Sequence, residues 1–234
     1  MDNNIKFRTE LKYRCSEKQL SVIKSRLDNL LKYDPHTSEE GVYTIRSMYF
    51  DSYNNRCYYE NENGVDPREK FRIRIYNASD SRISLECKHK ERNFEYKESC
   101  ILTKQQFDGI MKGGSLSDIE NSQPLLRKFT YLMKTELFRP AVIVEYERTP
   151  YVYKIGNVRI TLDRNIRSSK DYNGFFEKNI RTRQILPEGE QLLEVKYDEF
   201  LPDFLKDVLE LGNLQQTAFS KYYLCRKFSA GGKI

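Results

Sequence analysis

The chain has 234 residues, of which 32% are charged and 38% are hydrophobic, so it is polar for a globular chain of its size. An aromatic content of 13% still provides material for a core and excludes a disordered chain. The 40 basic and 34 acidic residues give a net charge of +6, and no apolar run of about 18 residues predicts a transmembrane helix.

The cysteines and histidines exclude several kinds of catalytic site. The five cysteines stand at positions 15, 57, 87, 100 and 225 with no C-x-x-C spacing, and the only histidines are His36 and His89. This set favours neither zinc hydrolysis nor a nucleophilic triad. Neither a P-loop nor the glycine-rich dinucleotide-binding motif is present.

The N-terminal segment bears on the compartment. Residues Met1–Glu10 are polar and lack the apolar segment of a signal peptide. Without an export signal, we expect reduced thiols and a cytoplasmic location. We expect no direct membrane insertion, although a membrane-protein partner stays open.

Alternation of polar and apolar residues predicts strands along most of the chain. In the first half the predicted strands are Ile5–Arg14, Val42–Phe50, Glu69–Tyr76, Ser81–Lys90 and Phe94–Leu102. In the second half they are Pro140–Tyr153, Val158–Ile166, Ile180–Leu186 and Gln191–Tyr197. A polar turn is expected between two of them, at Glu60–Pro67.

Helices are predicted between the strands. Ser16 and Gln19 have capping-box spacing at the start of one helix, and Thr103 and Gln106 repeat that spacing at another. The predicted helices are Ser16–Leu31, Thr103–Met111, Leu125–Leu137, Pro202–Leu211 and Gln216–Phe228. Many strands with few helices indicate an α+β fold, an antiparallel barrel with helices packed outside. No repeat or linker divides the chain, so we expect a single domain over residues 1–234.

Charged residues share one face on several of these strands. On one strand, Lys70, Arg72 and Arg74 point to the same side, opposite Phe71 and Ile73. Four other strands group charged or polar residues in the same way: Arg8, Glu10, Lys12 and Arg14; Glu86, Lys88 and Lys90; Arg159, Thr161 and Asp163; and Glu194 with Lys196. An ordinary half-buried sheet with its charges in water explains any single strand. Five such strands favour a barrel with a charged lumen and an apolar outer face.

The composition of these faces indicates a phosphate ligand. Several cations in a low-dielectric wall are costly without balancing anions, and phosphate oxygens match arginine forks and lysine ammonium groups. The carboxylates Glu10, Glu86 and Glu194 would repel phosphate directly unless they hold Mg²⁺ or Mn²⁺. Basic groups with metal-binding carboxylates are the elements of a phosphoryl-transfer site.

The same segments carry a resemblance to a known family. They are Glu10–Tyr13, Arg46–Asp51, Phe71–Tyr76, Leu85–Lys88, Glu145–Arg148, Val158–Asp163, Leu193–Tyr197 and Phe219–Tyr222. Together and in this order, they resemble the VTC-type polyphosphate polymerase domain of the triphosphate tunnel metalloenzyme superfamily. The resemblance implies a closed, eight-stranded antiparallel tunnel that binds triphosphate or polyphosphate with a divalent metal.

The resemblance also implies a role for individual residues. Arg72, Arg74, Lys221 and Glu194 would be the catalytic residues, and Glu194 would be the metal ligand for Mn²⁺ or Mg²⁺. The other phosphate-binding residues would be Lys12, Lys88, Lys97, Arg148, Arg159, Lys196 and Ser220. Ser220 and Lys221 would close over the phosphates, and Tyr146 would stack near a nucleoside.

Two departures from the family pattern are visible. Hydrolases of the superfamily carry E-x-E-x-K near the N-terminus, whereas this chain has Arg8 in place of the first acid, before Glu10 and Lys12. This difference favours the polymerase branch. A family lysine shortly before the Ser220–Lys221 pair is replaced by Ala218, so the growing chain would be bound differently.

For the predicted strand Pro140–Tyr153, the sequence does not determine which face is directed toward the site. Tyr146 and Arg148 lie opposite Glu145 and Glu147 by period-2 alternation, so only one pair faces the site without a bulge. The resemblance selects Tyr146 and Arg148.

These observations predict a polyphosphate polymerase that transfers the γ-phosphoryl group of ATP or another triphosphate to a polyphosphate chain. One alternative is a hydrolase of the same fold, in which Glu10 or Glu86 activates water. Another is a non-catalytic polyphosphate or nucleotide sensor. A nucleic-acid-binding β protein is less favoured, because tyrosines and basic residues do not share one open face, and we expect no nucleic-acid partner.

Overall fold

The computed structural model describes residues 8–35, 37, 41–92, 94–113 and 122–229. The chain forms two compact units, and each consists of several separate segments. Unit 1 contains residues 1–44, 146–167 and 184–220. Unit 2 contains residues 45–145, 168–183 and 221–234. Three long strands, β3, β7 and β8, contribute residues to both units.

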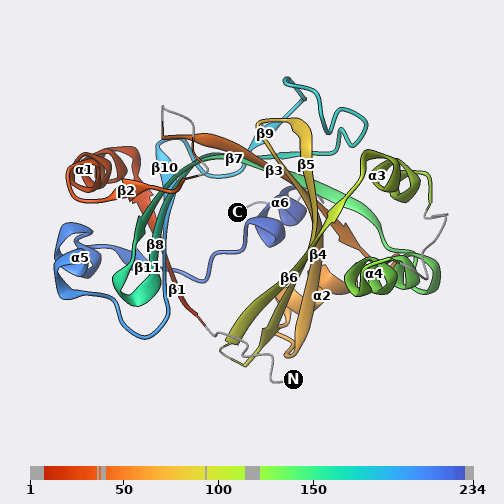
Figure 1. Cartoon of the computed structure of the whole chain (residues 1–234), viewed down its shortest axis with the longest axis horizontal. Coiled ribbons are helices and arrows are strands. Elements are labelled where there is room, and N and C mark those ends of the chain that lie inside the picture. Colours follow the sequence, from red (N-terminus) through yellow and green to blue (C-terminus); the bar gives the residue numbers. More distant parts are fainter. Residues whose placement is uncertain (1–7, 36, 38–40, 93, 114–121, 230–234) are drawn as a thin grey trace. The chain divides into compact units, whose positions relative to one another are not determined.

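Most of the predicted strands form, with shifted ends, and two short strands at Lys32–Tyr33 and Gln215–Gln216 were not predicted (Figure 1). They are β1 Thr9–Ser16, β2 Lys32–Tyr33, β3 Tyr43–Asp51, β4 Arg68–Tyr76, β5 Ser79–Glu91, β6 Phe94–Leu102, β7 Arg139–Tyr153, β8 Val158–Ser169, β9 Arg183–Gln184, β10 Glu190–Tyr197 and β11 Gln215–Gln216. The helices are α1 Glu17–Asp28, α2 Arg56–Glu62, α3 Lys104–Met111, α4 Pro124–Thr135, α5 Asp203–Val208 and α6 Lys221–Ser229, with 3-10 turns η2 Ile155–Asn157 and η3 Leu211–Asn213. Of the helices in the described ranges, none is long and apolar enough to cross a bilayer.

Unit 1 is built on antiparallel pairing of β1 with β10 and of β10 with β8. The register places Glu194 between Lys12 and Thr161 on the neighbouring strands. The opposite face of these strands is apolar and packs against α1, which buries Leu20, Ile23 and Leu27. The predicted capping box is confirmed, since the Ser16 side chain accepts from the backbone of Gln19 at the start of α1.

Unit 2 is built on β3, β4, β5 and β6, which pair in chain order. The turn between β4 and β5 contains Asn77 and Ala78, with φ of 52° and 54°, as a two-residue hairpin turn requires. This turn and the adjacent bulge fix the register that places Lys70 opposite Lys88. The apolar face of β4 packs against α4, where the rings of Phe71 and Phe129 lie 5.5 Å apart.

The predicted closed barrel of eight strands is wrong. The described residues form one eleven-stranded sheet in the order β11-β1-β10-β8-β7-β3-β4-β5-β6, with β2 on β7 and β9 on β8, and the sheet is not closed. The two end strands explain why it stays open. β11 has only two residues, both exposed, and β6 carries the charges of Glu95, Lys97 and Glu98, which are typical of an edge strand.

Three further predictions of local structure differ from the fold. The expected polar turn at 60–67 begins inside α2, a helix that the sequence did not reveal. Of the predicted strand at 180–186, only Arg183–Gln184 is extended. The last predicted helix begins at Lys221 instead of Gln216, because Gln215–Gln216 pairs with β1. Residues 5–7 of the first predicted strand lie outside the described residues.

Candidate functional site

The first group of predicted site residues lies on the charged face of unit 2. Lys70, Arg72 and Arg74 project from one face of β4, and the register aligns Lys70 with Lys88 on β5 and Lys88 with Lys97 on β6. Three lysines therefore form a row across three neighbouring strands. We call the set Lys70, Arg72, Arg74, Lys88 and Lys97, with the carboxylates Glu86 and Glu95, the basic cluster.

Glu86 is the centre of the basic cluster. Its side chain lies 2.6 Å from Arg72 Nη2, 2.7 Å from Lys97 Nζ and 3.9 Å from Arg74 Nη1. Burial alone would raise the pKa of Glu86, but Arg72, Arg74 and Lys97 hold it far below its ordinary value. Such a carboxylate stays ionised and is a weak base, so Glu86 is poorly suited to activating water as the hydrolase alternative would need.

Tyr49 completes the same region from β3. Its register partner is Arg72, whose Nη1 donates to the Tyr49 hydroxyl at 2.8 Å. Burial would raise the pKa of Tyr49, but the positive charges of Arg72, Arg74 and Lys221 lower it below the ordinary value. The predicted catalytic residue Lys221, at the start of α6, therefore acts electrostatically on the same hydroxyl. Sequence reasoning missed Tyr49, because only the strand register aligns it with Arg72.

Lys70 is the most perturbed cation of the basic cluster. Burial, together with the neighbouring charges of Arg68 and Lys88, lowers its pKa to about 7. Its ammonium donates to Asn61 Oδ1 of α2 and lies 5.5 Å from the centre of the Tyr222 ring. Lys70 shares a face with Arg72 and Arg74, so alternation along the strand was a sufficient signal to include it in the predicted site.

The second group of predicted residues lies on the charged face of unit 1. Lys12 Nζ lies 2.9 Å from Glu10 Oε1, and Lys196 Nζ lies 2.9 Å from Glu194 Oε1 and 3.6 Å from Glu10 Oε1. The Glu194 side chain is buried, with 4% of the residue exposed. Cross-strand pairing alternates the signs, since Glu10 is opposite Lys196 and Lys12 is opposite Glu194.

Arg148 joins this group from β7. Its Nε and Nη2 each donate to one oxygen of Asp163 at 2.7 Å, and its Nη2 lies 3.9 Å from Glu194. Burial would lower the pKa of Arg148, but Asp163, Tyr146 and Glu194 raise it well above the ordinary value. We call Glu10, Lys12, Arg148, Asp163, Glu194 and Lys196 the paired-charge cluster. Asp163 was not among the predicted site residues, although it shares the face of Arg159.

Three predicted residues lie outside the two clusters. Tyr146 is buried, with the Arg148 guanidinium 5.2 Å from its ring centre, so that ring is covered on this side. Arg159 is the cross-strand partner of Lys196 and contacts Asp34 at 3.0 Å and the Tyr43 hydroxyl at 3.2 Å. Ser220 directly precedes Lys221, the first residue of α6.

On β7, the two glutamates that alternate with Tyr146 and Arg148 contact partners outside the paired-charge cluster. In unit 2, Glu145 Oε2 accepts from Arg46 Nε at 2.6 Å, and both side chains are buried. In unit 1, Glu147 accepts from Asn165 at 3.0 Å. From the same strand, Arg148 donates both hydrogen bonds to Asp163.

Carboxylate oxygens that suit a hard divalent cation are present in unit 1. Glu10 and Glu194 both contact the ammonium of Lys196, so a positive charge is already accommodated between the two side chains. Their oxygens are the kind of ligand that Mg²⁺ and Mn²⁺ prefer. Glu10 and Glu194 therefore fit the metal site that the sequence predicted.

A different set of metal-ligand types lies on the apolar side of unit 2. Among the described residues, Glu69, Cys87 and His89 bring three potential ligand atoms together. Burial raises the pKa of the Cys87 thiol, so this side chain is a neutral thiol in the metal-free protein. Hydrogen bonding from His89 lowers the pKa of Glu69 to about 2, which identifies the group as a hydrogen-bonded charge network.

Comparison with known proteins gives a family match. The family model described as the VTC domain matches residues 7–229, which confirms the predicted family and spans residues of both units. No curated protein matches the chain.

Solved structures show the fold more widely. A Bacillus halodurans protein described as "a putative adenylate cyclase" matches with a TM-score of 0.54 and 14% identity, covering 92% of this chain and 94% of its own. The "Putative adenylyl cyclase HpAC1 from Hippeastrum" matches with a TM-score of 0.57 and 11% identity, covering 98% and 97%. The PH1819 protein from Pyrococcus horikoshii matches with a TM-score of 0.50 and 14% identity, covering 95% and 98%. At these identities the similarity establishes the shared fold.

Proposed function

Because the chain belongs to the VTC domain family, we propose that it is a metal-dependent phosphotransferase that extends inorganic polyphosphate. The donor would be the γ-phosphoryl group of ATP or another nucleoside triphosphate. The observation that carries the proposal is the basic cluster of unit 2, in which five basic side chains on neighbouring strands are grouped around the carboxylates Glu86 and Glu95.

The charge imbalance of the basic cluster indicates what it binds. Like charges directly opposite each other in a sheet are destabilising, and Lys70, Lys88 and Lys97 form two such pairs. A chain of phosphates, with negative charge on every unit, would relieve this repulsion. The two arginines add planar donors that match phosphate oxygens in pairs, as lysines do not.

The paired-charge cluster of unit 1 supports the metal requirement. Glu194 and Glu10 would hold Mg²⁺ or Mn²⁺, for which Lys196 would move away from their oxygens. When bound, the ion would neutralise negative charge on phosphate oxygens. Arg148 is already held by Asp163 through two hydrogen bonds, so its orientation would not have to be selected on binding.

The proposed reaction needs no general base. The terminal phosphate of polyphosphate is an anion at neutral pH, so one of its oxygens can attack the γ-phosphorus directly. A new P–O bond forms to the chain, the bond between the γ-phosphorus and the bridging oxygen breaks, and the nucleoside diphosphate leaves with that electron pair. Arg72 and Arg74 would hold the oxygens of two mutually repelling anions in line, which is catalysis by positioning and electrostatics.

A triphosphatase is the second candidate, because the Hippeastrum protein with the same fold is described as having a dominant triphosphatase activity. In that reaction water replaces the polyphosphate end as the nucleophile and needs a base. Two observations count against it. Glu86 is a weak base, and Glu10, the other candidate base, is engaged by Lys12 and Lys196. Arg8, at the position of the missing acid, is held by Asp198 at 2.8 Å.

One experiment separates these activities. The protein is incubated with ATP and Mn²⁺ or Mg²⁺, with a chelator as the metal-free control, and the products are run on a gel that resolves polyphosphate while free phosphate is measured in parallel. We expect long polyphosphate that disappears with the chelator. Phosphate without polymer would establish the triphosphatase, and binding of triphosphate without either product would establish a sensor.

A matched pair of variants ties the activity to the basic cluster. Arg74→Ala removes a cation of the cluster, whereas Arg82→Ala removes an exposed arginine from the neighbouring strand β5. We expect polymer synthesis to be lost in the first variant and retained in the second. Equal synthesis by both would contradict the assignment of the cluster.

A further inference from the structure

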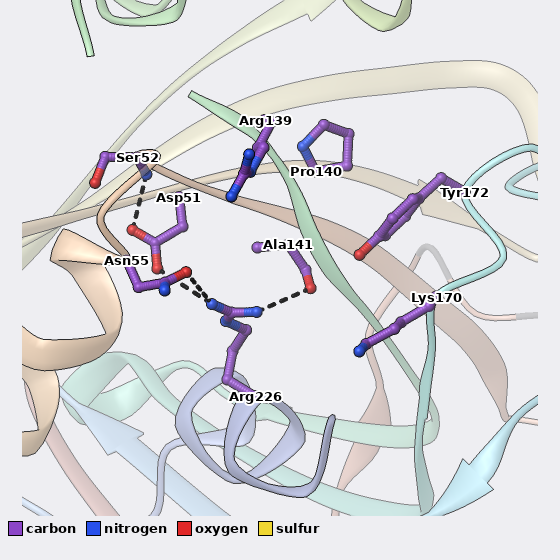
Figure 2. Close-up of a pocket in the computed structure, with 9 residues that line it drawn as sticks. All are labelled: Asp51, Ser52, Asn55, Arg139, Pro140, Ala141, Lys170, Tyr172 and Arg226. Carbon is purple, nitrogen blue, oxygen red and sulfur yellow. Dashed lines mark hydrogen bonds and ion pairs between the residues drawn. The ribbon is translucent and has the colours of Figure 1, made fainter. Parts of the chain in front are cut away.

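Unit 2 contains a second group of cations, which line a pocket of about 170 Å³ (Figure 2). The pocket lies where the end of β3, the start of β7, the segment after β8 and helix α6 meet. Its lining residues are Asp51, Ser52, Asn55, Arg139, Pro140, Ala141, Lys170, Tyr172 and Arg226. None of its three cations belongs to the basic cluster, and the predicted site included none of these residues.

The one carboxylate of the pocket is already used. Asp51 accepts hydrogen bonds from the backbone amides of Ser52, Cys57 and Tyr58, at 2.9, 2.8 and 3.2 Å, and from the Tyr222 hydroxyl at 2.6 Å. These bonds fix the start of α2 and hold α6 against β3. The nearest guanidinium nitrogen, on Arg226, is 3.9 Å away. Asp51 therefore offsets only part of the positive charge around the pocket.

Arg226 is held in place by two hydrogen bonds. Its Nη2 donates to Asn55 Oδ1 at 2.5 Å and its Nη1 to the Ala141 carbonyl at 3.4 Å (Figure 2). Its Nε is buried and has no hydrogen-bond partner among the described residues. The guanidinium therefore contributes a positive charge at a fixed position in the lining of the pocket.

The other polar groups of the pocket surround the same space. Figure 2 shows the ammonium of Lys170 and the guanidinium of Arg226 directed into the pocket, with the Tyr172 hydroxyl beside them. Burial raises the pKa of Tyr172, while Arg226 and Arg139 act in the opposite direction, so both arginines lie close enough to influence that hydroxyl. The pocket thus offers two guanidinium groups, one ammonium and one neutral hydroxyl donor.

We propose that this pocket is a second anion site, which binds an inorganic phosphate group. The group is either free phosphate or the end of a polyphosphate chain. Three cations against one satisfied carboxylate favour a doubly charged oxyanion, and guanidinium groups match phosphate oxygens. The volume is sufficient for a small oxyanion such as phosphate. The proposal does not depend on whether the chain makes polyphosphate.

The pocket is separate from the basic cluster but connected to it through α6. The Tyr222 hydroxyl donates a hydrogen bond to Asp51. The Tyr222 ring lies 5.0 Å from the ring of Tyr49, and the Lys70 ammonium lies over the Tyr222 ring. Lys221 and Arg226 are five residues apart on α6, which corresponds to about 7.5 Å along the helix and a rotation of about 140°. The two cations therefore leave the helix on different sides.

Lys170 provides a site-specific readout, because its side chain is exposed enough to be acetylated. The full-length protein is treated with an amine-acetylating reagent over a titration of sodium phosphate, with sodium chloride at matched ionic strength, and acetylation at Lys170 is followed by mass spectrometry. We expect phosphate to slow acetylation at Lys170 at least threefold, and chloride not to do so. Protection by phosphate no greater than by chloride would overturn the proposal.

Two variants decide whether the protection comes from this pocket. In Arg72→Ala/Arg74→Ala, which disables the basic cluster, protection of Lys170 should persist. In Arg139→Ala, the phosphate concentration for half protection should rise about tenfold, since a charged hydrogen-bond donor is lost. Arg82→Ala is the matched control and should leave it unchanged. Loss of Lys170 protection in Arg72→Ala/Arg74→Ala would overturn the proposal. An unchanged phosphate concentration for half protection in Arg139→Ala would also overturn it.

The same titration with tripolyphosphate distinguishes the two sources of phosphate. Protection by both compounds at similar concentrations identifies free phosphate as sufficient. Protection by tripolyphosphate at much lower concentrations identifies the end of a polyphosphate chain. Either result supports a phosphate site, whereas protection by neither compound contradicts it.

Discussion

The basic cluster of unit 2 and the paired-charge cluster of unit 1 are built by the same alternation of residues along strands, yet their charges are organised in opposite ways. Between β1 and β10 of unit 1, cross-strand partners carry opposite signs, as in Lys12 with Glu194 and Glu10 with Lys196, although Lys196 also faces Arg159 on β8. In unit 2, Lys70, Lys88 and Lys97 are aligned with one another, although Arg72 faces Glu86. The paired-charge cluster thus has three basic and three acidic side chains, whereas the basic cluster has five basic and two acidic ones, and we propose that a bound anion offsets this excess.

This difference indicates which cluster should affect folding stability most and which should affect ligand binding most. In the paired-charge cluster each charge has a partner in the chain, so removal of one partner should be costly. In the basic cluster, we expect the aligned lysines to lower the stability of the free protein and an anionic ligand to recover that cost on binding. The following predictions test or refine this contrast, from the largest expected effect to the smallest.

The largest effect is expected from Asp163→Asn in unit 1. The variant removes the carboxylate that accepts two hydrogen bonds from the buried Arg148 and leaves that guanidinium with Glu194 at 3.9 Å, which should lower the free energy of unfolding by about 3–5 kcal/mol. Urea denaturation followed by circular dichroism measures the change. The double variant Arg148→Met/Asp163→Leu is the control, since removal of both charges should restore most of the loss. A single variant as stable as the wild type would refute the structural role of the pair.

A large effect on catalysis is expected from Arg74→Ala in unit 2. Loss of a guanidinium that stabilises developing charge should lower kcat/KM for polymer synthesis by about 100-fold or more. Stability should change little or increase, because a like charge is removed from the cluster. Steady-state kinetics and thermal unfolding of the same preparation measure the two quantities. A destabilised variant with near-normal turnover would show that Arg74 serves folding and not catalysis.

A moderate effect is expected from the lowered pKa of Lys70. At pH 8 this lysine is mostly neutral in the free protein, since its pKa is about 7, and a bound phosphate would raise that pKa. Binding of tripolyphosphate should therefore take up close to one proton at pH 8 and far less at pH 6. Calorimetry in buffers of different ionisation enthalpy measures the uptake. In Lys70→Met the uptake should disappear, and an unchanged value would show that another group is responsible.

The lowered pKa of Lys70 also affects how folding stability depends on pH. A lysine with a pKa of about 7 in the folded state and an ordinary value of 10.5 in the unfolded state binds fewer protons when folded. Its contribution to stability therefore increases as pH rises from about 7 to 10.5. The Lys70→Met variant should show a smaller rise across this window in otherwise matched unfolding experiments.

The smallest effect compares one lysine from each cluster. Lys196→Met removes the partner of Glu194 and should lower the free energy of unfolding by about 1 kcal/mol, as a partly exposed ion pair does. Lys88→Met removes one ion pair with Glu95, but it also removes the repulsion between Lys88 and the two lysines opposite it. Its effect on the free energy of unfolding should therefore be near zero or stabilising. Chemical denaturation of both variants measures the difference. A greater loss for Lys88→Met would mean that the lysine row is already balanced in the free protein.

The sequence was most informative where alternation alone determines the answer. It predicted that Arg72 and Arg74 share a face and that Ser16 and Thr103 cap helices. It also indicated family membership, because several short segments occur in a fixed order. Each of these inferences depends on residues close together in the chain.

The sequence was least informative where distant segments decide the outcome. Whether a sheet closes depends on its end strands, and the two-residue β11 was not predicted, because Gln216 was assigned to the start of a helix. Helix α2 was missed because its start is stabilised by Asp51, which no local capping pattern indicates. Tyr49 depends on the register between β3 and β4, and the pocket cations Arg139, Lys170 and Arg226 come from three separate segments.

The discontinuity of the two units has a genetic consequence. Because β3, β7 and β8 each supply residues to both units, neither unit corresponds to an uninterrupted stretch of coding sequence. A frameshift, exon loss or recombination crossover within one of these strands would alter both units at once. The balanced and unbalanced charge arrangements are therefore transmitted together, and recombination cannot readily exchange one without the other.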